Sequence, residues 1–225
     1  MSSAAQLRPG PPPALNSERY ARDYNEIKAV GAKQSTTRSA EQTAIARFWT
    51  ANSPAIYQEL VRSAVDTPDR DVMRNARLFA ALTQAVDDAL IAVFDAKYNY
   101  AFWRPITAIR NGDRDGNDAT ERDPGWLPFI DTPMHPEYPC AHCIAASTVA
   151  TVLAADLDRS AVPLLTTTSP SADGVARHWA TLDEFVAEVS NARIYDGVHY
   201  RYSTEVGAEM GRKVGALAIA KYLRN

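Results

Sequence analysis

Cysteine is scarce in this chain of 225 residues, which contains only Cys140 and Cys143. Two cysteines cannot build the disulfide framework that holds small secreted domains together. No apolar run approaches the ~20 residues that a membrane-spanning helix needs. The first residues lack the basic and apolar regions of a signal peptide, although a mature form whose leader had been removed would read the same way. We therefore expect a soluble protein without a membrane span, and the sequence leaves its compartment undecided between retention and export.

An excess of positive charge is also missing. The chain has 24 Lys and Arg against 27 Asp and Glu, for a formal net charge of −3. Nucleic acids and anionic membranes are bound by basic surfaces, so we expect neither as a partner, and we expect any cationic cluster to form a local pocket. The length suits one buried core, which predicts a single domain.

Prolines gather at the start of the chain, at Pro9 and at positions 11–13. This composition is typical of an extended segment, so residues 1–16 are predicted to form a proline-rich arm, followed by one helical domain over residues 17–225. Such an arm would pack over the body of its own chain or over a second subunit. A homodimer joined through the arm is the oligomer that this pattern favours.

Segments with the period-2 alternation of strands are lacking, whereas helical periodicity and helix start signals recur. The sequence therefore predicts an all-α fold, a helical bundle. Start signals mark three expected helices, which are 18–30 between Ser17 and Gly31, a helix opened by the capping box of Ser39 and Gln42, and 55–64 after Ser53-Pro54. Further helices are expected at about 70–102, about 140–156, 173–192 and 200–223. A loop is expected over 163–170. Small residues in the last helix, among them Gly207, Gly211 and Gly215, predict close approach to a neighbour.

The stretch from Asp131 to Ala150 reads DTPMHPEYPCAHCIAASTVA. Its prolines at 133, 136 and 139 exclude helix before them, so the helix begins at about Cys140 or Ala141. The free N–H groups of a helix N-terminus attract anions. A cationic and imidazole-rich complement is offered by two other segments, Lys97 to Pro105 and Arg193 to His199. We therefore expect these three stretches to surround one anion.

Residues 106–139 read as a long loop, and a loop of this length in a compact domain is usually functional. The segment 113–118 has the acidic spacing of a calcium loop only in part. Asp118 stands where the calcium loop needs glycine, and the terminal bidentate glutamate is missing. We expect a solvated loop there.

The order and spacing of Lys97-x6-Arg104-Pro105, Pro139-Cys-Ala-His142 and Arg193-x5-His199 resemble a known three-part pattern. It is that of the superfamily joining vanadate-dependent haloperoxidases with type 2 phosphatidic-acid phosphatases and bacterial class A acid phosphatases, KxxxxxxRP, PSGH and SRxxxxxHxxxD. The residues that flank these motifs resemble those of the haloperoxidase branch. The resemblance implies a helical bundle with a vanadate cofactor in a pocket that phosphate can also occupy. The implied reaction oxidises halide with hydrogen peroxide and passes the product to an organic acceptor.

The resemblance also implies a role for each matched residue. Lys97, Arg104 and Arg193 would neutralise the equatorial oxygens of the oxyanion, with Cys140 and the N–H of Ala141 completing the binding loop.

His199 would be the axial nitrogen ligand of vanadium, or the nucleophile if the central atom is phosphorus. His142 would be the acid and base that handles the peroxide proton. His135 falls where bromide-oxidising relatives carry histidine and chloride-oxidising ones an aromatic residue, which favours bromide or iodide. Trp103 is expected beside the halide or in the wall of the pocket.

The chain departs from the family pattern at four positions, Cys140 for serine, Ala141 for glycine, Ala192 for serine and Ser203 for aspartate. The lost aspartate would leave His199 without an orienting carboxylate unless Asp196 replaces it. These departures keep two alternatives open. One is an acid phosphatase that hydrolyses phosphomonoesters through a phosphohistidine at His199, and the other is a degenerate anion-binding homologue with little turnover.

For several single residues a structural or unrelated role is an alternative to a role in the anion site. The C-x-x-C spacing of Cys140 and Cys143 is that of a redox pair, but the βαβ context of such motifs is missing. We favour separate roles, with Cys140 lining the anion loop and Cys143 packing as a small hydrophobe. For Lys97 and Arg104 the alternative is ion pairing with the aspartates at 87, 88 and 95. His178 matches no part of the pattern and is expected to be structural.

Overall fold

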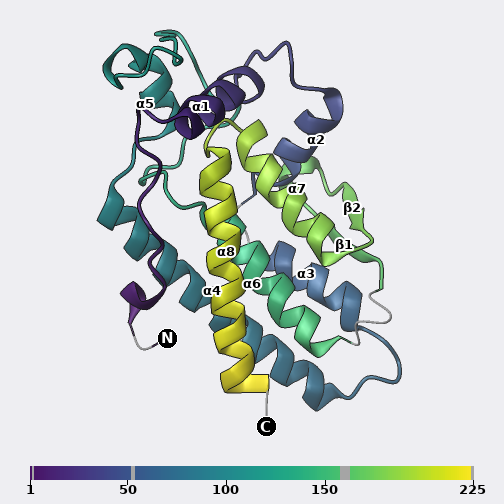
Figure 1. Cartoon of the computed structure of the whole chain (residues 1–225). Coiled ribbons are helices and arrows are strands. Elements are labelled where there is room, and N and C mark those ends of the chain that lie inside the picture. The colour runs from purple at the N-terminus through teal and green to yellow at the C-terminus, as the bar shows by residue number, and fades with distance from the viewer. Residues whose placement is uncertain (2, 52–53, 158–162, 224–225) are drawn as a thin grey trace.

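The structure, a computed structural model, describes residues 1, 3–51, 54–157 and 163–223. It is all-α apart from one small hairpin, which confirms the predicted fold class (Figure 1). The α-helices are α1 (Glu18–Val30), α2 (Ala40–Phe48), α3 (Pro54–Val65), α4 (Val72–Tyr100), α5 (Pro105–Arg110), α6 (Ala141–Asp156), α7 (Leu182–Tyr195) and α8 (Arg201–Ala218). Short elements are the 3-10 helices η1 (Ala4–Leu7), η2 (Gly112–Arg114) and η3 (Pro170–Ala172), the π-helix η4 (Ile219–Leu223), and strands β1 (Leu165–Thr168) and β2 (Ala176–Trp179).

Helix starts follow the local capping chemistry. The Ser17 hydroxyl accepts the N–H of Tyr20 at the start of α1. Ser39 and Gln42 form the predicted capping box of α2, in which each side chain accepts an N–H of the other residue's backbone. Ser53, expected to open α3, lies outside the described residues. The long helix α4 begins after Asp71, whose carboxylate accepts the N–H of Met73.

Helix α6 lies at the centre of the bundle, between α4, α7 and α8 (Figure 1). Its residues from Cys143 to Ala150 are all buried, and its apolar character on every side suits this position. The small residues of α8 face α6, as close packing requires. A Cβ added at Gly211 would lie 2.4 Å from the carbonyl oxygen of Ile144, and one at Gly207 would lie 2.6 Å from that of Cys140.

The hairpin corrects the prediction of a loop over 163–170 and a helix from 173. Strands β1 and β2 pair antiparallel, with Leu165 opposite Trp179, and both side chains are buried in the core. Helix α7 begins only at Leu182, because Thr181 and Glu184 form a capping box there. The β-branched run of threonines before Ser169 is typical of a strand.

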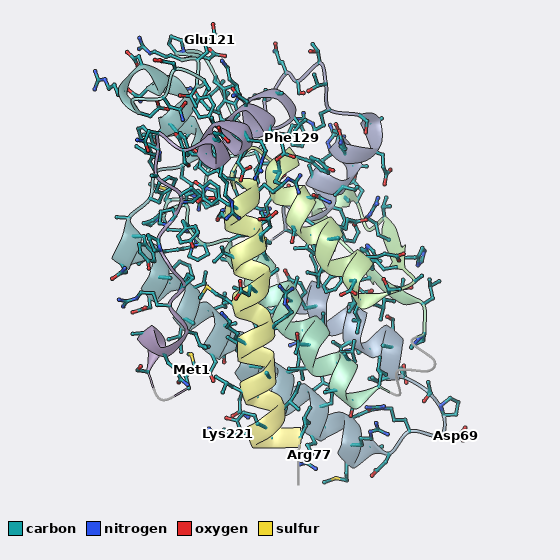
Figure 2. All side chains as sticks on the ribbon, in the orientation of Figure 1. Met1, Asp69, Arg77, Glu121, Phe129 and Lys221 are labelled. Atoms are coloured by element: carbon teal, nitrogen blue, oxygen red, sulfur yellow. A yellow bond between two sulfur atoms is a disulfide. The ribbon has the colours of Figure 1, made fainter. Side chains whose placement is uncertain are left out.

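The proline-rich arm packs against its own chain and runs along α4 (Figure 1). Arg8 forms an ion pair with Asp95 at 2.8 Å, and the hydroxyls of Tyr100 and Tyr138 donate to the carbonyls of Pro9 and Gly10. Figure 2 places Met1 and Lys221 at one end of the bundle and Glu121, in the long loop, at the other. None of the described helices is long and apolar enough to cross a membrane.

Candidate functional site

Segments far apart in the sequence meet at one cavity of about 390 Å³. Lys97 lies in the last turn of α4, Arg104 precedes α5, Arg193 lies in the last turn of α7, and His199 precedes α8. The cavity is lined by Thr50, Pro54, Tyr57, Val86, Leu90, Phe94, Ile130, Asp131, Pro133, His135, Ala141, His142, Ala145, Arg193 and His199. The lining thus combines three imidazoles and the guanidinium of Arg193 with an apolar wall from α3 and α4, whereas Lys97 and Arg104 are not among the lining residues.

Arg104 holds two of the three site histidines. Its guanidinium nitrogens lie 3.3 Å from Nε2 of His199 and 3.1 Å from Nδ1 of His135, and they also donate to the carbonyls of His135 and Val198. A guanidinium can only donate, so both contacted ring nitrogens accept. His199 therefore carries its proton on Nδ1 and His135 on Nε2. In this tautomer the 3.2 Å approach of His135 Nδ1 to the carbonyl of Pro136 is not a hydrogen bond.

The proton on His199 Nδ1 points at a carboxylate that the sequence did not single out. Oε1 of Glu137 lies 2.8 Å from Nδ1 of His199 and 3.1 Å from the N–H of Tyr200. Burial raises the pKa of Glu137 to about 7, against the attraction of Lys97 and Arg104. In the sequence, Glu137 could have been noticed only as the one charged residue between Pro136 and Pro139.

Asp196 does not orient His199, which corrects the expected compensation. Its carboxylate lies 2.6 Å from the guanidinium of Arg193, and both side chains are buried. Arg193 also donates to the carbonyl of Trp49. Burial raises the pKa of Asp196 to about 7, although Arg193 and Arg38 pull it down.

Lys97 is fully buried and donates to the carbonyls of Pro136 and Glu137 at 2.9 and 2.8 Å. The alternative of ion pairing within α4 is wrong for two of the aspartates, because Asp95 binds Arg8 and Asp88 binds the amino group of Met1. Burial, and after it the charge of Arg104, lowers the pKa of Lys97 well below its usual value. The ammonium is thus held at the loop that also carries Glu137.

Two polar atoms at the cavity have no hydrogen-bond partner among the described residues. They are Nε2 of His142 and Nε of Arg193, both buried. Burial lowers the pKa of His142 well below its ordinary value, and Arg193 and Lys97 add to the effect. Buried polar atoms left unpaired are costly, so a polar ligand in the cavity would gain hydrogen-bond partners at these two atoms.

The structure joins Cys140 to Cys143 in a disulfide, which corrects the expectation of separate roles. Both are fully buried, and Sγ of Cys140 accepts the N–H of Cys143 at the start of α6. Cys140 and Trp103 are not among the residues that line the cavity, whereas Ala141 is. Trp103 packs against the aromatic cluster that includes Tyr20 and Tyr200. His178 lies away from the site, on β2, within 2.9 Å of the Thr166 hydroxyl.

Comparison with known proteins identifies the family. Residues 77–225 match the family model described as the VCPO second helical-bundle domain. The chain belongs to the vanadium haloperoxidase family. It is 31% identical over 143 residues to the vanadium chloroperoxidase of Curvularia inaequalis, an alignment that covers 51% of this chain and 23% of that protein.

Two solved structures share the fold of this family member. A bacterial vanadium-dependent iodoperoxidase superposes with a TM-score of 0.81 at 26% identity, covering 98% of this chain and 54% of the other. A bacterial vanadium-dependent chloroperoxidase in its holo form superposes with a TM-score of 0.77 at 19% identity, covering 99% and 53%. The chain thus spans about half the length of these solved relatives.

Proposed function

We propose that this chain is a haloperoxidase-like oxidoreductase that binds vanadate and oxidises halide with hydrogen peroxide. The observation that carries the proposal is the meeting of Arg193, His142 and His199 at one cavity, with Arg104 in contact with His199. Membership of the vanadium haloperoxidase family supports the same reading.

The donor set fits a vanadate ion. Lys97, Arg104 and Arg193 would hold its oxygens by charge, and the N–H of Ala141, the first residue of α6, would add a donor. The unpartnered Nε–H of Arg193 would gain an acceptor, and the unpartnered Nε2 of His142 would gain a partner. His199 would be the ligand through Nε2, which carries a lone pair because the proton lies on Nδ1, and the ion would replace the contact of this nitrogen with Arg104. When bound, vanadate supplies Lewis acidity, which polarises peroxide without a change in the oxidation state of the metal.

The histidines can handle protons in their neutral form. His142 has a depressed pKa and an unpartnered Nε2, so it is suited to accept a proton from hydrogen peroxide and return it to the leaving oxygen. His135 lines the cavity, where its Nε2–H would be the donor available to a halide. A neutral N–H donor and the histidine at this position favour bromide or iodide over chloride. The similar iodoperoxidase agrees with this preference, whereas the curated relative is named for chloride.

Phosphomonoester hydrolysis is the second candidate, and one observation favours it. The Glu137 carboxylate supplies His199 with the orienting partner that a histidine nucleophile needs, so loss of aspartate at position 203 does not disable this chemistry. A pocket built for a vanadate centre also suits the transition state of phosphoryl transfer.

The first experiment follows bromination and iodination of a dye with and without added vanadate, beside p-nitrophenyl phosphate hydrolysis. We expect vanadate to activate the first reaction and inhibit the second, with halide oxidation the larger turnover. His199→Ala should abolish vanadate-dependent oxidation, because it removes the metal ligand. His178→Ala, the matched control at an exposed position of the hairpin, should retain it. Equal effects of the two replacements, or phosphate hydrolysis alone, would refute the haloperoxidase assignment.

A further inference from the structure

The carboxylate partner of His199 comes from a different element than the family pattern leads one to expect. That pattern has aspartate four residues after the second histidine, where this chain has Ser203. We propose that Glu137 positions His199, so that a loop residue performs here what an aspartate on the following helix performs in the pattern. The inference rests on the proposed vanadate site and deepens it.

The Glu137 side chain is held in place by burial and by two hydrogen bonds. Its side chain is fully buried, and its Oε1 accepts from His199 Nδ1 at 2.8 Å and from the Tyr200 N–H at 3.1 Å. Two donors from consecutive residues hold this one oxygen in place, and burial restricts the rest of the side chain. The imidazole therefore has a fixed acceptor for its Nδ1–H.

The contact decides which nitrogen of His199 can bind a metal. The proton on Nδ1 is held by Glu137, so Nε2 carries the lone pair, and this nitrogen lies 3.3 Å from Arg104. Histidine ligands typically donate their second ring N–H to a carboxylate, which fixes the tautomer and raises ligand basicity. Glu137 thus keeps His199 in the form that a vanadium ligand requires.

Position 203 reaches the same nitrogen from α8. The Ser203 hydroxyl lies 3.5 Å from His199 Nδ1, at the limit of a hydrogen bond. The second oxygen of Glu137 has no partner among the described residues. A carboxylate at either position can therefore face this imidazole, and in this chain only Glu137 carries one.

The backbone of Glu137 holds a second site group. Its carbonyl accepts from the ammonium of Lys97 at 2.8 Å, and its N–H donates to the carbonyl of Phe102 at 2.9 Å. The same residue thus connects the end of α4 with His199. A carboxylate at this loop position is therefore linked to Lys97 as well as to His199, which a carboxylate on α8 would not be.

The test measures vanadate affinity by calorimetry in the full chain carrying Glu137→Ala, Glu137→Gln, or Glu137→Ala combined with Ser203→Asp. Glu137→Ala should weaken vanadate binding by about 10- to 100-fold, the usual cost of losing the partner of a metal-binding histidine. Glu137→Gln keeps an accepting oxygen but no charge, so its loss should be smaller. The combination should recover at least about tenfold, because the new carboxylate faces the same nitrogen. Glu209→Ala, an exposed glutamate paired with Lys213, is the matched control and should bind as the parent does.

A second readout needs no oxyanion. Nitrogen-15 NMR of His199 should find the proton on Nδ1 in the parent chain and a mixture of tautomers in Glu137→Ala. An unchanged tautomer together with unchanged affinity in both Glu137 variants would overturn the inference, as would a folded Glu137→Ala chain that Ser203→Asp does not rescue. If the parent chain bound no vanadate, the proposed function would fail, whereas the NMR comparison would still decide the role of Glu137.

Discussion

Among the site residues, His135 is the one whose charge state can be followed most directly. Burial lowers its pKa to about 4, and the charges of Lys97 and Arg104 act in the same direction. The ring is therefore neutral over the range in which a free histidine titrates. Its proposed role as an N–H donor to halide should not change with pH above about 4.

This depressed pKa predicts a pH-dependent stability. Between about pH 6.5 and 4 the unfolded chain binds a proton at His135 that the folded chain does not, so stability falls as the pH falls through this window. His135→Gln removes that contribution. We expect the parent chain to lose more stability than the variant between pH 7 and 4.5, measured as urea midpoints. His178→Gln should follow the parent, and parallel pH profiles for parent and His135→Gln would contradict the assignment.

At the scale of single residues, the sequence singled out the cations and histidines of the family pattern but not the carboxylate of Glu137. Arg104, Arg193 and His199 could be chosen because their order and spacing resemble the family pattern. Glu137 could not, because its importance lies in a contact between residues 62 positions apart, which no local pattern encodes. Asp196 was closer in sequence to His199 and was the wrong choice, because its side chain turns to Arg193.

At the scale of elements, the contact of α6 with α8 sets the position of His142. Gly211 has no room for a side chain, since an added Cβ would lie 2.4 Å from the carbonyl of Ile144 and 2.8 Å from Cβ of Ser147. Gly211→Ala should therefore push the two helices apart and destabilise the fold by about 1–3 kcal/mol, the usual cost of overpacking a core. Urea unfolding measures the loss.

A control for this replacement exists in the arm. Gly10 has nothing within 4 Å of an added Cβ, so Gly10→Ala should leave the urea midpoint nearly unchanged. A Gly211→Ala chain as stable as this control would show that the helices can separate at little cost.

Helices with explicit start signals were predictable, and the hairpin was not. The capping residues Ser17, Ser39 and Gln42 act within one turn, so their effect can be read from the sequence. Strand β2 instead depends on pairing with β1 and on the burial of Trp179 against distant aromatic rings. The disulfide at the start of α6 was missed because C-x-x-C spacing alone does not separate a bonded pair from two thiols.

At the scale of the whole molecule, the arm ties the beginning of the chain to the loop of the site. Its residues Pro9 and Gly10 accept from Tyr100 and Tyr138, and Tyr138 adjoins Glu137. Deletion of residues 1–10 should lower the melting temperature by about 2–8 °C, since it removes a few hydrogen bonds worth about 1 kcal/mol each. Calorimetry of the two chains measures the shift.

The same deletion tests the proposed homodimer through the arm. If the contacts of the arm are only those with its own chain, the truncated and full chains should have the same oligomeric state in solution, measured by light scattering. Dissociation of a dimer on truncation would instead assign the arm to a second subunit.

Arg104 and His199 lie 95 positions apart along the chain, yet they are 3.3 Å from each other beside the cavity that His199 lines. An ion held in this cavity would act as a removable crosslink, since its oxygens would join Arg193 at the end of α7 and His199 before α8 to Ala141 at the beginning of α6. The chemistry and the cohesion of the bundle would then depend on the same few contacts. A change that loosens one of these helices should therefore weaken the affinity for the ion before it unfolds the chain.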